Sequence, residues 1–235
     1  MLPAPLFFPM GDQALIVEFG DRIDPALSAQ IAAVAKRLRE ALPIGVIDIV
    51  PTYSTLAIHY DSAAVGAGTS PYDALVETID AWLKTQPAAA PPDGPLIEIP
   101  VCYGGAFGED LEGLAESRNL SVEEVIAIHS SAAYYVHMLG FVPGFAYLGG
   151  LDARLATPRR DTPRPRVPAG SVAIGGEQTG VYPLDTPGGW HIIGRTPLRL
   201  FKADAMPPSL LNAGDTVRFV PISTQEFEAR SKSAT

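Results

Sequence analysis

The sequence predicts an α+β protein with two domains, a small split-βαβ (ferredoxin-like) domain followed by a domain of short strands that form a β-barrel or sandwich. Three observations lead to this fold class. Apolar periodicity between positions 14 and 84 gives the order β-α-β-β-α. A proline-rich segment then interrupts the pattern near residue 90, and beyond residue 140 the apolar runs are short and separated by Gly and Pro.

The N-terminal elements follow in order. The apolar run 14–20 ends in glycine and indicates a strand. Segments 24–42 and 70–84 each begin with a capping residue and a proline, and they repeat apolar residues at helical spacing. The alternating, β-branched segment 45–61 predicts two strands. The run 96–101 is a candidate for the last strand of a split βαβ sheet.

The C-terminal part begins with a strand at 96–104, followed by helices at about 109–118 and 121–135. Ser121 and Glu124 form the capping-box pattern that starts the second helix. After residue 140, many short strands with turn signals between them indicate a β-barrel or sandwich, and the absence of helical crossovers disfavours a parallel α/β sheet. We therefore divide the chain into a domain at 1–86, a linker at 87–95, a barrel domain at 96–225 and a tail at 226–235.

Composition excludes several classes of function. The net charge of −9 and the pI near 4.9 argue against a general nucleic-acid-binding surface. Cys102 is the single cysteine, so no disulfide can form within the chain. The N-terminus lacks the basic residues of a secretory signal, and no apolar run approaches the ~20 residues that span a membrane. We expect a cytoplasmic protein without membrane or nucleic-acid partners.

The most unusual segment is rich in arginine. Five of the thirteen arginines lie between positions 154 and 166, and nearby prolines stiffen the backbone. These arginines are Arg154, Arg159, Arg160, Arg164 and Arg166. Guanidinium groups on a rigid loop suit carboxylate or phosphate ligands, because each can bind two oxygens at once. A solvated basic loop whose arginines pair with acids of the same fold is an equally good interpretation.

Two glycine pairs, at 175–176 and 188–189, predict tight turns that could present backbone N–H groups to an anion. Ordinary barrel hairpins explain such pairs equally well. The neighbouring donors are Gln178, Thr179, Tyr182, Trp190 and Arg195. Neither a P-loop nor a G-x-G-x-x-G turn occurs.

The stretch GFVPGFAYLGG at 140–150 combines turn residues with aromatic rings. Pro143-Gly144 predicts a type-II-like turn between Phe141 and Phe145. With Tyr147, we expect these rings to form a rigid wall of a cleft that orients the arginine segment.

Among the histidines, His129 is the strongest functional candidate, although a hydrogen-bonded role in the core is the favoured interpretation. A zinc site is improbable from the His and Cys spacing, and Cys102 is expected to be a small buried residue. The acidic residues Asp152, Asp161, Glu177 and Asp185 are scattered, so the sequence identifies no metal ligands.

The segment 140–201 resembles the signature block of the allophanate hydrolase subunit 1 or KipI family, whose bacterial members are mostly the B subunit of 5-oxoprolinase (PxpB). The matching motifs are G-F-x-P-G-F-x-Y-L-G-G-L-D, R-x-x-V-P-A-G-S-V, Q-T-G-x-Y-P, T-P-G-G-W and I-G-R-T-P-L. Thr186 stands where serine is commoner. The resemblance implies a cyclophilin-like barrel for the second domain.

The resemblance also implies an activity. Family members work with a KipA or C-type subunit and a lactam-handling A subunit, and the complex hydrolyses 5-oxoproline to glutamate at the expense of ATP, with Mg²⁺. The implied alternatives are an inhibitor that docks on a histidine kinase and a subunit related to allophanate hydrolase or urea amidolyase. No complete catalytic set is visible in this chain, so we expect a composite site that a partner subunit completes.

We take Arg159, Arg166 and His129 as candidate catalytic residues. The candidates for binding substrate or nucleotide are Phe141, Pro143, Gly144, Phe145, Tyr147, Arg154, Arg160, Arg164, Gly170, Ser171, Gln178, Thr179, Tyr182, Gly188, Gly189, Trp190 and Arg195.

Overall fold

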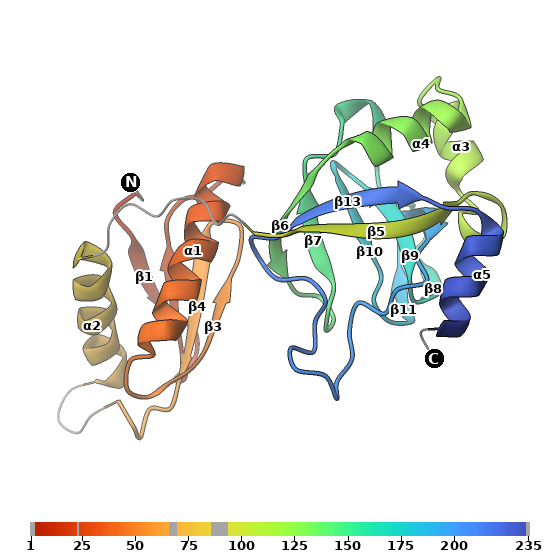
Figure 1. The fold of residues 1–235 in the computed structure, drawn as a ribbon. Helices are drawn as coiled ribbons and strands as arrows, with labels where there is room; N and C mark the ends of the chain where they lie inside the picture. Colours follow the sequence, from red (N-terminus) through yellow and green to blue (C-terminus); the bar gives the residue numbers. More distant parts are fainter. Residues whose placement is uncertain (1–2, 23, 66–69, 86–93, 234–235) are drawn as a thin grey trace. The chain divides into compact units, whose positions relative to one another are not determined.

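The computed structural model describes residues 3–22, 24–65, 70–85 and 94–233. The chain divides into two compact units, one up to residue 93 and one from residue 94 (Figure 1). Most of the predicted linker at 87–95 lies outside the described residues, so that boundary stays a prediction.

The first unit is a four-stranded antiparallel sheet with the strand order β1-β2-β4-β3 and two helices. Its elements are β1 (Leu6–Pro9), β2 (Ala14–Glu18), α1 (Pro25–Ala41), β3 (Val46–Pro51), β4 (Thr55–Tyr60) and α2 (Pro71–Thr85). The prediction that 96–101 would complete this sheet is wrong. The N-terminal strand β1 pairs with β2 and takes that place, whereas residues 96–101 belong to the second unit.

Local signals in the sequence account for the helices of this unit. The Asp24 carboxylate accepts a hydrogen bond from the Ala26 N–H at 2.8 Å and caps α1, which has proline in its first turn. Ile31 and Leu38 of α1 and Ile79 of α2 are fully buried against the sheet. One apolar stripe on each helix therefore builds the core of the unit.

The second unit contains a closed seven-stranded barrel with the order β10-β7-β6-β13-β5-β12-β9. Strands β13 and β5 are parallel, and the other neighbours are antiparallel. The barrel strands are β5 (Leu96–Tyr103), β6 (Tyr134–Leu139), β7 (Ala146–Gly149), β9 (Ser171–Gly175), β10 (Gln178–Val181), β12 (His191–Arg195) and β13 (Thr216–Pro221). The predicted α+β class, with its split-βαβ sheet and barrel, is confirmed.

Shorter elements surround the barrel (Figure 1). These are η1 (Gly105–Phe107), α3 (Leu111–Ser117), α4 (Val122–Ser131), η2 (Ala153–Leu155), α5 (Thr224–Ser233) and the two-stranded sheet of β8 (Arg164–Val167) and β11 (Thr186–Gly188). The second predicted helix ends earlier than expected, because the residues from Tyr134 onward enter β6. Most of the residues predicted as a tail form α5.

Among the residues that the structure describes, no helix is long and apolar enough to cross a membrane.

Candidate functional site

The arginine loop, residues 154–166, is fastened to the barrel through its backbone. Thr157 and Gly176 exchange two backbone hydrogen bonds of 3.0 and 2.7 Å. The Arg160 N–H donates to the Gly189 carbonyl at 2.8 Å, and His191 Nε2 donates to the carbonyl of Pro158 at 2.9 Å. The structure therefore brings the arginine loop and both glycine pairs together, although they are separate in the sequence, and the pair at 188–189 lies at the end of β11 and does not form the predicted tight turn.

One carboxylate fixes two of the five arginines. Asp110 Oδ1 accepts hydrogen bonds from Arg160 Nη1 at 3.1 Å and from Arg164 Nη2 at 2.7 Å. Its other oxygen, Oδ2, accepts from the backbone N–H of Ile192 at 2.6 Å. Glu109 forms a second ion pair with Arg164 at 2.9 Å. Sequence reasoning missed Asp110, because it lies far before the loop in the sequence.

Two further arginines pair with acids close to them at the surface. Arg154 contacts Asp152 at 2.7 Å, and Arg166 contacts Asp185 at 2.5 Å. The Arg166 side chain is 76% exposed, so solvent screens this pair strongly. The side-chain hydrogen bond from Arg154 lowers the pKa of Asp152 to about 2, and a hydrogen bond from the Ala169 backbone N–H lowers the pKa of Asp185.

Arg159 differs from the other four arginines of the loop. It is exposed and forms no ion pair with any acid in the described ranges. Its guanidinium carbon lies 5.8 Å from the ring centroid of Trp190, a distance at which a cation–π attraction operates. Arg159 is therefore an exposed cation that contacts an aromatic ring and has no acidic partner among the described residues.

The aromatic residues form a packed cluster beneath this arginine. Phe145 makes edge contacts with Tyr147, Tyr182 and Trp190 at centroid distances of 5.0, 5.6 and 5.7 Å. Burial raises the pKa of Tyr182, partly offset by a backbone hydrogen bond from Trp190 and by the nearby Arg159 and Arg164. Tyr182 is thus a neutral hydroxyl in a buried aromatic cluster, and the prediction that these rings form the wall of a cleft stays a prediction.

The turn at 142–145 has the predicted geometry. The Phe145 N–H donates to the Val142 carbonyl at 3.1 Å, and Gly144 has φ of +80°, as the third residue of a type II turn requires. Phe141 also has a positive φ, +70°, and its side chain remains 62% exposed. The aromatic stretch is a strained corner that supports Phe145 and leaves the Phe141 ring in solvent.

We expect Gly144→Ala to destabilise the protein by about 2–3 kcal/mol, because φ is positive there and a Cβ would lie 2.7 Å from the Phe201 Cβ. Gly113→Ala is the matched control. Gly113 lies in α3 with no atom within 4 Å of an added Cβ, so alanine should stabilise the helix by about 0.5–1 kcal/mol. Urea unfolding of both variants measures the difference. An unchanged free energy of unfolding in Gly144→Ala would contradict the type II turn at 142–145.

His129 lies inside the second unit with 0% exposure. Its Nε2 lies 2.9 Å from Thr179 Oγ1, which itself donates to the Ala173 carbonyl, so Nε2 is the donor and Nδ1 accepts from the Tyr103 hydroxyl at 2.8 Å. The ring stacks on Phe219 at 4.5 Å. Burial lowers its pKa to about 3. This geometry favours the structural role over the catalytic one.

The other candidates lie in the barrel strands and in the turns between them. Ser171 and Thr179 are buried in the barrel strands, and Gln178 begins β10. Arg195 Nε donates to the Ala169 carbonyl at 2.9 Å, next to Gly170, which has φ of +83°. At Gly188, an added Cβ would collide with the Tyr182 hydroxyl. Pro143 is exposed in the type II turn.

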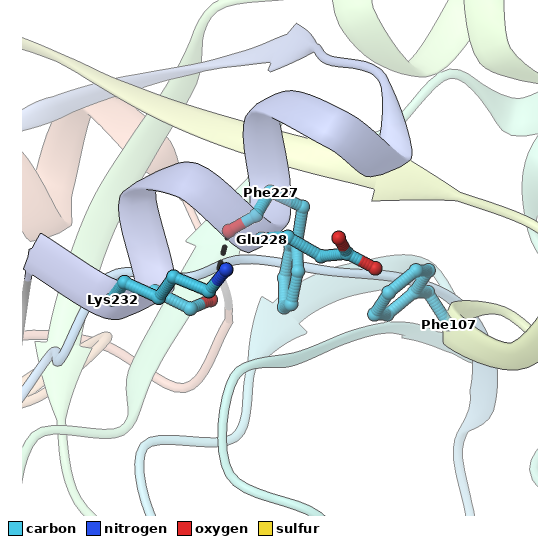
Figure 2. Close-up of a pocket in the computed structure, with 5 residues that line it drawn as sticks. Phe107, Phe227, Glu228 and Lys232 are labelled. Atoms are coloured by element: carbon cyan, nitrogen blue, oxygen red, sulfur yellow. Dashed lines mark hydrogen bonds between the residues drawn. The ribbon is translucent and has the colours of Figure 1, made fainter.

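In the described part of the chain, no group of three or more His, Cys, Asp or Glu side chains could hold a metal ion. A hollow of about 320 Å³ lies between η1 and α5, lined by Phe107, Phe227, Glu228, Ser231 and Lys232 (Figure 2). The rings of Phe107 and Phe227 contact each other there at 4.4 Å. None of the predicted site residues lines this hollow.

Comparison with known proteins gives consistent matches. A family model described as "Carboxyltransferase domain, subdomain C and D" matches residues 5–211. The chain is 44% identical over 225 residues to the B subunit of 5-oxoprolinase from Bacillus subtilis (strain 168), and the alignment covers 94% of both chains.

Solved structures share the fold. The crystal structure of a protein named TTHA0988 is 36% identical with a TM-score of 0.78, over 90% of this chain but 40% of that longer one. The K. lactis urea amidolyase structure is 18% identical with a TM-score of 0.75, over 99% of this chain and 16% of that one. At this identity, the second likeness shows the fold alone.

Proposed function

Because the chain belongs to the carboxyltransferase-domain family (subdomain C and D) and to the family of 5-oxoprolinase B subunits, we propose that it is the B component of a cytoplasmic, ATP-dependent 5-oxoprolinase complex. The overall reaction converts 5-oxo-L-proline, ATP and water into L-glutamate, ADP and phosphate. A KipA or C-type subunit and a lactam-handling A subunit act with it. The identity over nearly the whole of both chains supports this assignment.

The environment of Arg159 is the structural observation that supports this chemical activity. Its guanidinium lies over Trp190 without an acidic partner among the described residues. Opening a stable lactam with ATP requires a cation near the phosphoryl group that moves, and a positioned arginine supplies one without reorganisation. Arg159 therefore receives an anionic group of substrate or nucleotide, and the aromatic cluster below it excludes water.

The residues of the site fit the phosphates of ATP better than they fit a metal ion. Arg159 offers donors without an acidic partner among the described residues, whereas the carboxylates of Asp110, Asp152 and Asp185 are already bound to arginines or to backbone N–H groups. Mg²⁺ would supply further charge neutralisation if it arrived with the nucleotide. No general base is evident beside Arg159 among the residues that the structure describes, so the partner subunit would complete a composite site.

Reconstitution tests the proposal. We expect the chain alone to be inactive, and we expect it to form glutamate and ADP in equal amounts when mixed with A and C subunits, ATP, Mg²⁺ and 5-oxoproline. The control is the same A and C pair with the corresponding Bacillus subtilis protein. Turnover with the control but none with this chain would contradict the proposal. Inhibition of histidine kinase autophosphorylation by the chain would then favour the inhibitor alternative.

A further inference from the structure

We propose that Asp110 is a positioning residue of the site: it binds Arg160 and Arg164, and it thereby leaves their neighbour Arg159, which has no acidic partner among the described residues, to bind the ligand. This inference rests on the proposed function, because it assigns a role in the same anion site. The inference extends the site to a residue at the start of α3, in a different part of the fold. Asp110 itself does not contact the ligand.

The Asp110 carboxylate is largely buried and fully engaged in hydrogen bonds. Its side chain is 11% exposed and accepts three hydrogen bonds, two of them from arginines 50 and 54 residues away and one from the Ile192 N–H, 82 residues away. Its own N–H donates to the Ile192 carbonyl at 2.9 Å. One carboxylate thus ties the α3 end, strand β12 and the arginine loop to one another.

Asp110 does not act as an ordinary helix cap. It occupies the N-cap position of α3, yet its side chain makes no capping hydrogen bond. A carboxylate at this position usually accepts from the first N–H groups of the helix. Here the carboxylate oxygens accept hydrogen bonds from the arginine loop and from β12 instead. The N-terminus of α3 therefore lacks a side-chain cap, and the carboxylate holds the loop.

Holding Arg160 determines where Arg159 lies. Arg160 is fixed at its backbone by the Gly189 carbonyl and at its side chain by Asp110. The preceding residue, Arg159, is thereby oriented over the Trp190 ring, next to Gly189 in the sequence. Without Asp110, the side chains of Arg160 and Arg164 would lose their shared carboxylate, and the loop around Arg159 would be held only by the hydrogen bonds of its backbone to Gly189 and His191.

The local charge makes the inference testable. Arg159, Arg160 and Arg164 oppose Glu109 and Asp110, which leaves one surplus positive charge. Asp110→Asn increases that surplus. If charge alone attracted the anion, binding would become tighter. If Asp110 acts by positioning Arg159, binding becomes weaker although the site is more positive.

The experiment uses the full chain with Trp82→Phe, which leaves Trp190 as the only tryptophan and hence a fluorescent reporter beside Arg159. MgATP and inorganic phosphate are the probes. We expect Asp110→Asn to weaken binding at least tenfold, Asp110→Glu to restore part of it, and Arg159→Met to abolish the Trp190 response. Asp152→Asn is the control, because Asp152 pairs with a single arginine of the same loop at the surface.

Thermal unfolding and kinetics separate positioning from folding. All titrations are made well below the melting temperature of each variant, and in the reconstituted complex KM for ATP should rise more than kcat falls. Arg164→Met removes one partner of Asp110 and should also weaken binding; it serves as the test if Asp110→Asn does not fold. In the double variant Asp110→Asn with Arg164→Met, the two losses should not add.

Each result decides one point. Unchanged or tighter anion binding in Asp110→Asn, or in Arg164→Met where it replaces that variant, overturns the positioning role. A loss with Arg159→Met but not with Asp110→Asn rejects that role and leaves the proposed site intact. An unchanged Trp190 response and unchanged turnover with Arg159→Met overturn the site itself.

Discussion

Arg159→Met is expected to lower the turnover of the reconstituted complex at least a hundredfold and to leave the stability of the chain almost unchanged. Removing one donor that stabilises transition-state charge costs about 10²–10³ in kcat. Arg159 is exposed and contacts the Trp190 ring, so the substitution should alter the free energy of unfolding by no more than about 0.5 kcal/mol. Methionine keeps the length of the side chain and contact with the indole.

The matched controls are two other arginines of the loop. Arg154→Met and Arg166→Met each remove a surface ion pair, which contributes little to stability because solvent screens it. Both should leave turnover within about threefold of the wild type. The sequence did not rank the five arginines, and it placed Arg166 beside Arg159 as a catalytic candidate. If Arg159→Met and Arg166→Met lowered turnover equally, the ion pair between Arg166 and Asp185 would have to open in the complex.

Steady-state kinetics with varied ATP and varied 5-oxoproline identify the group that Arg159 receives. A rise in KM for one substrate alone indicates binding of its ground state, whereas an equal fall in kcat and kcat/KM indicates an interaction made only in the transition state. Thermal unfolding of each variant is the check on folding. An active Arg159→Met complex would place the anion site elsewhere.

The elements that sequence reasoning found are those that a local pattern specifies. Helix α1 has a capping aspartate, a proline and a continuous apolar stripe, and all three are visible between positions 24 and 41. The partner of a strand is not a local property. Residues 96–101 could be recognised as a strand, but their pairing with β13, at the far end of the chain, could not. Strand β1 was missed because it is short and ends in proline.

The same distinction applies to the site. The arginine loop was found because five like charges between positions 154 and 166 are visible in any short window. The difference between Arg159 and its neighbours depends on Asp110, Glu109 and Asp185, and the first two lie far from the loop in the sequence. An isolated aspartate before a helix carries the signal of a cap, so Asp110 gave no reason to expect a second role.

Stability should fall steeply in mild acid because of His129. The unfolded chain binds a proton at this histidine near its ordinary pKa of about 6.5, whereas burial lowers the folded pKa to about 3. Between these values the unfolded state binds more protons, so its free energy falls relative to the folded state. The contribution is complete above about pH 6.5 and is lost by about 1.4 kcal/mol per pH unit as the pH decreases toward 3.

His129→Gln isolates this effect. Glutamine keeps one donor for Thr179 and one acceptor for Tyr103 but does not titrate. We expect the variant to be less stable than the wild type at pH 7.5 and to lose less stability between pH 6.5 and pH 4.5, as measured by urea unfolding. His137, whose pKa burial also lowers, acts in the same direction in both proteins, and Asp215, whose pKa burial raises, acts in the opposite one. These contributions cancel when the free energy of unfolding of the variant is subtracted from that of the wild type at each pH. Parallel curves would mean that His129 is protonated in the folded chain, which would restore it as a candidate acid or base.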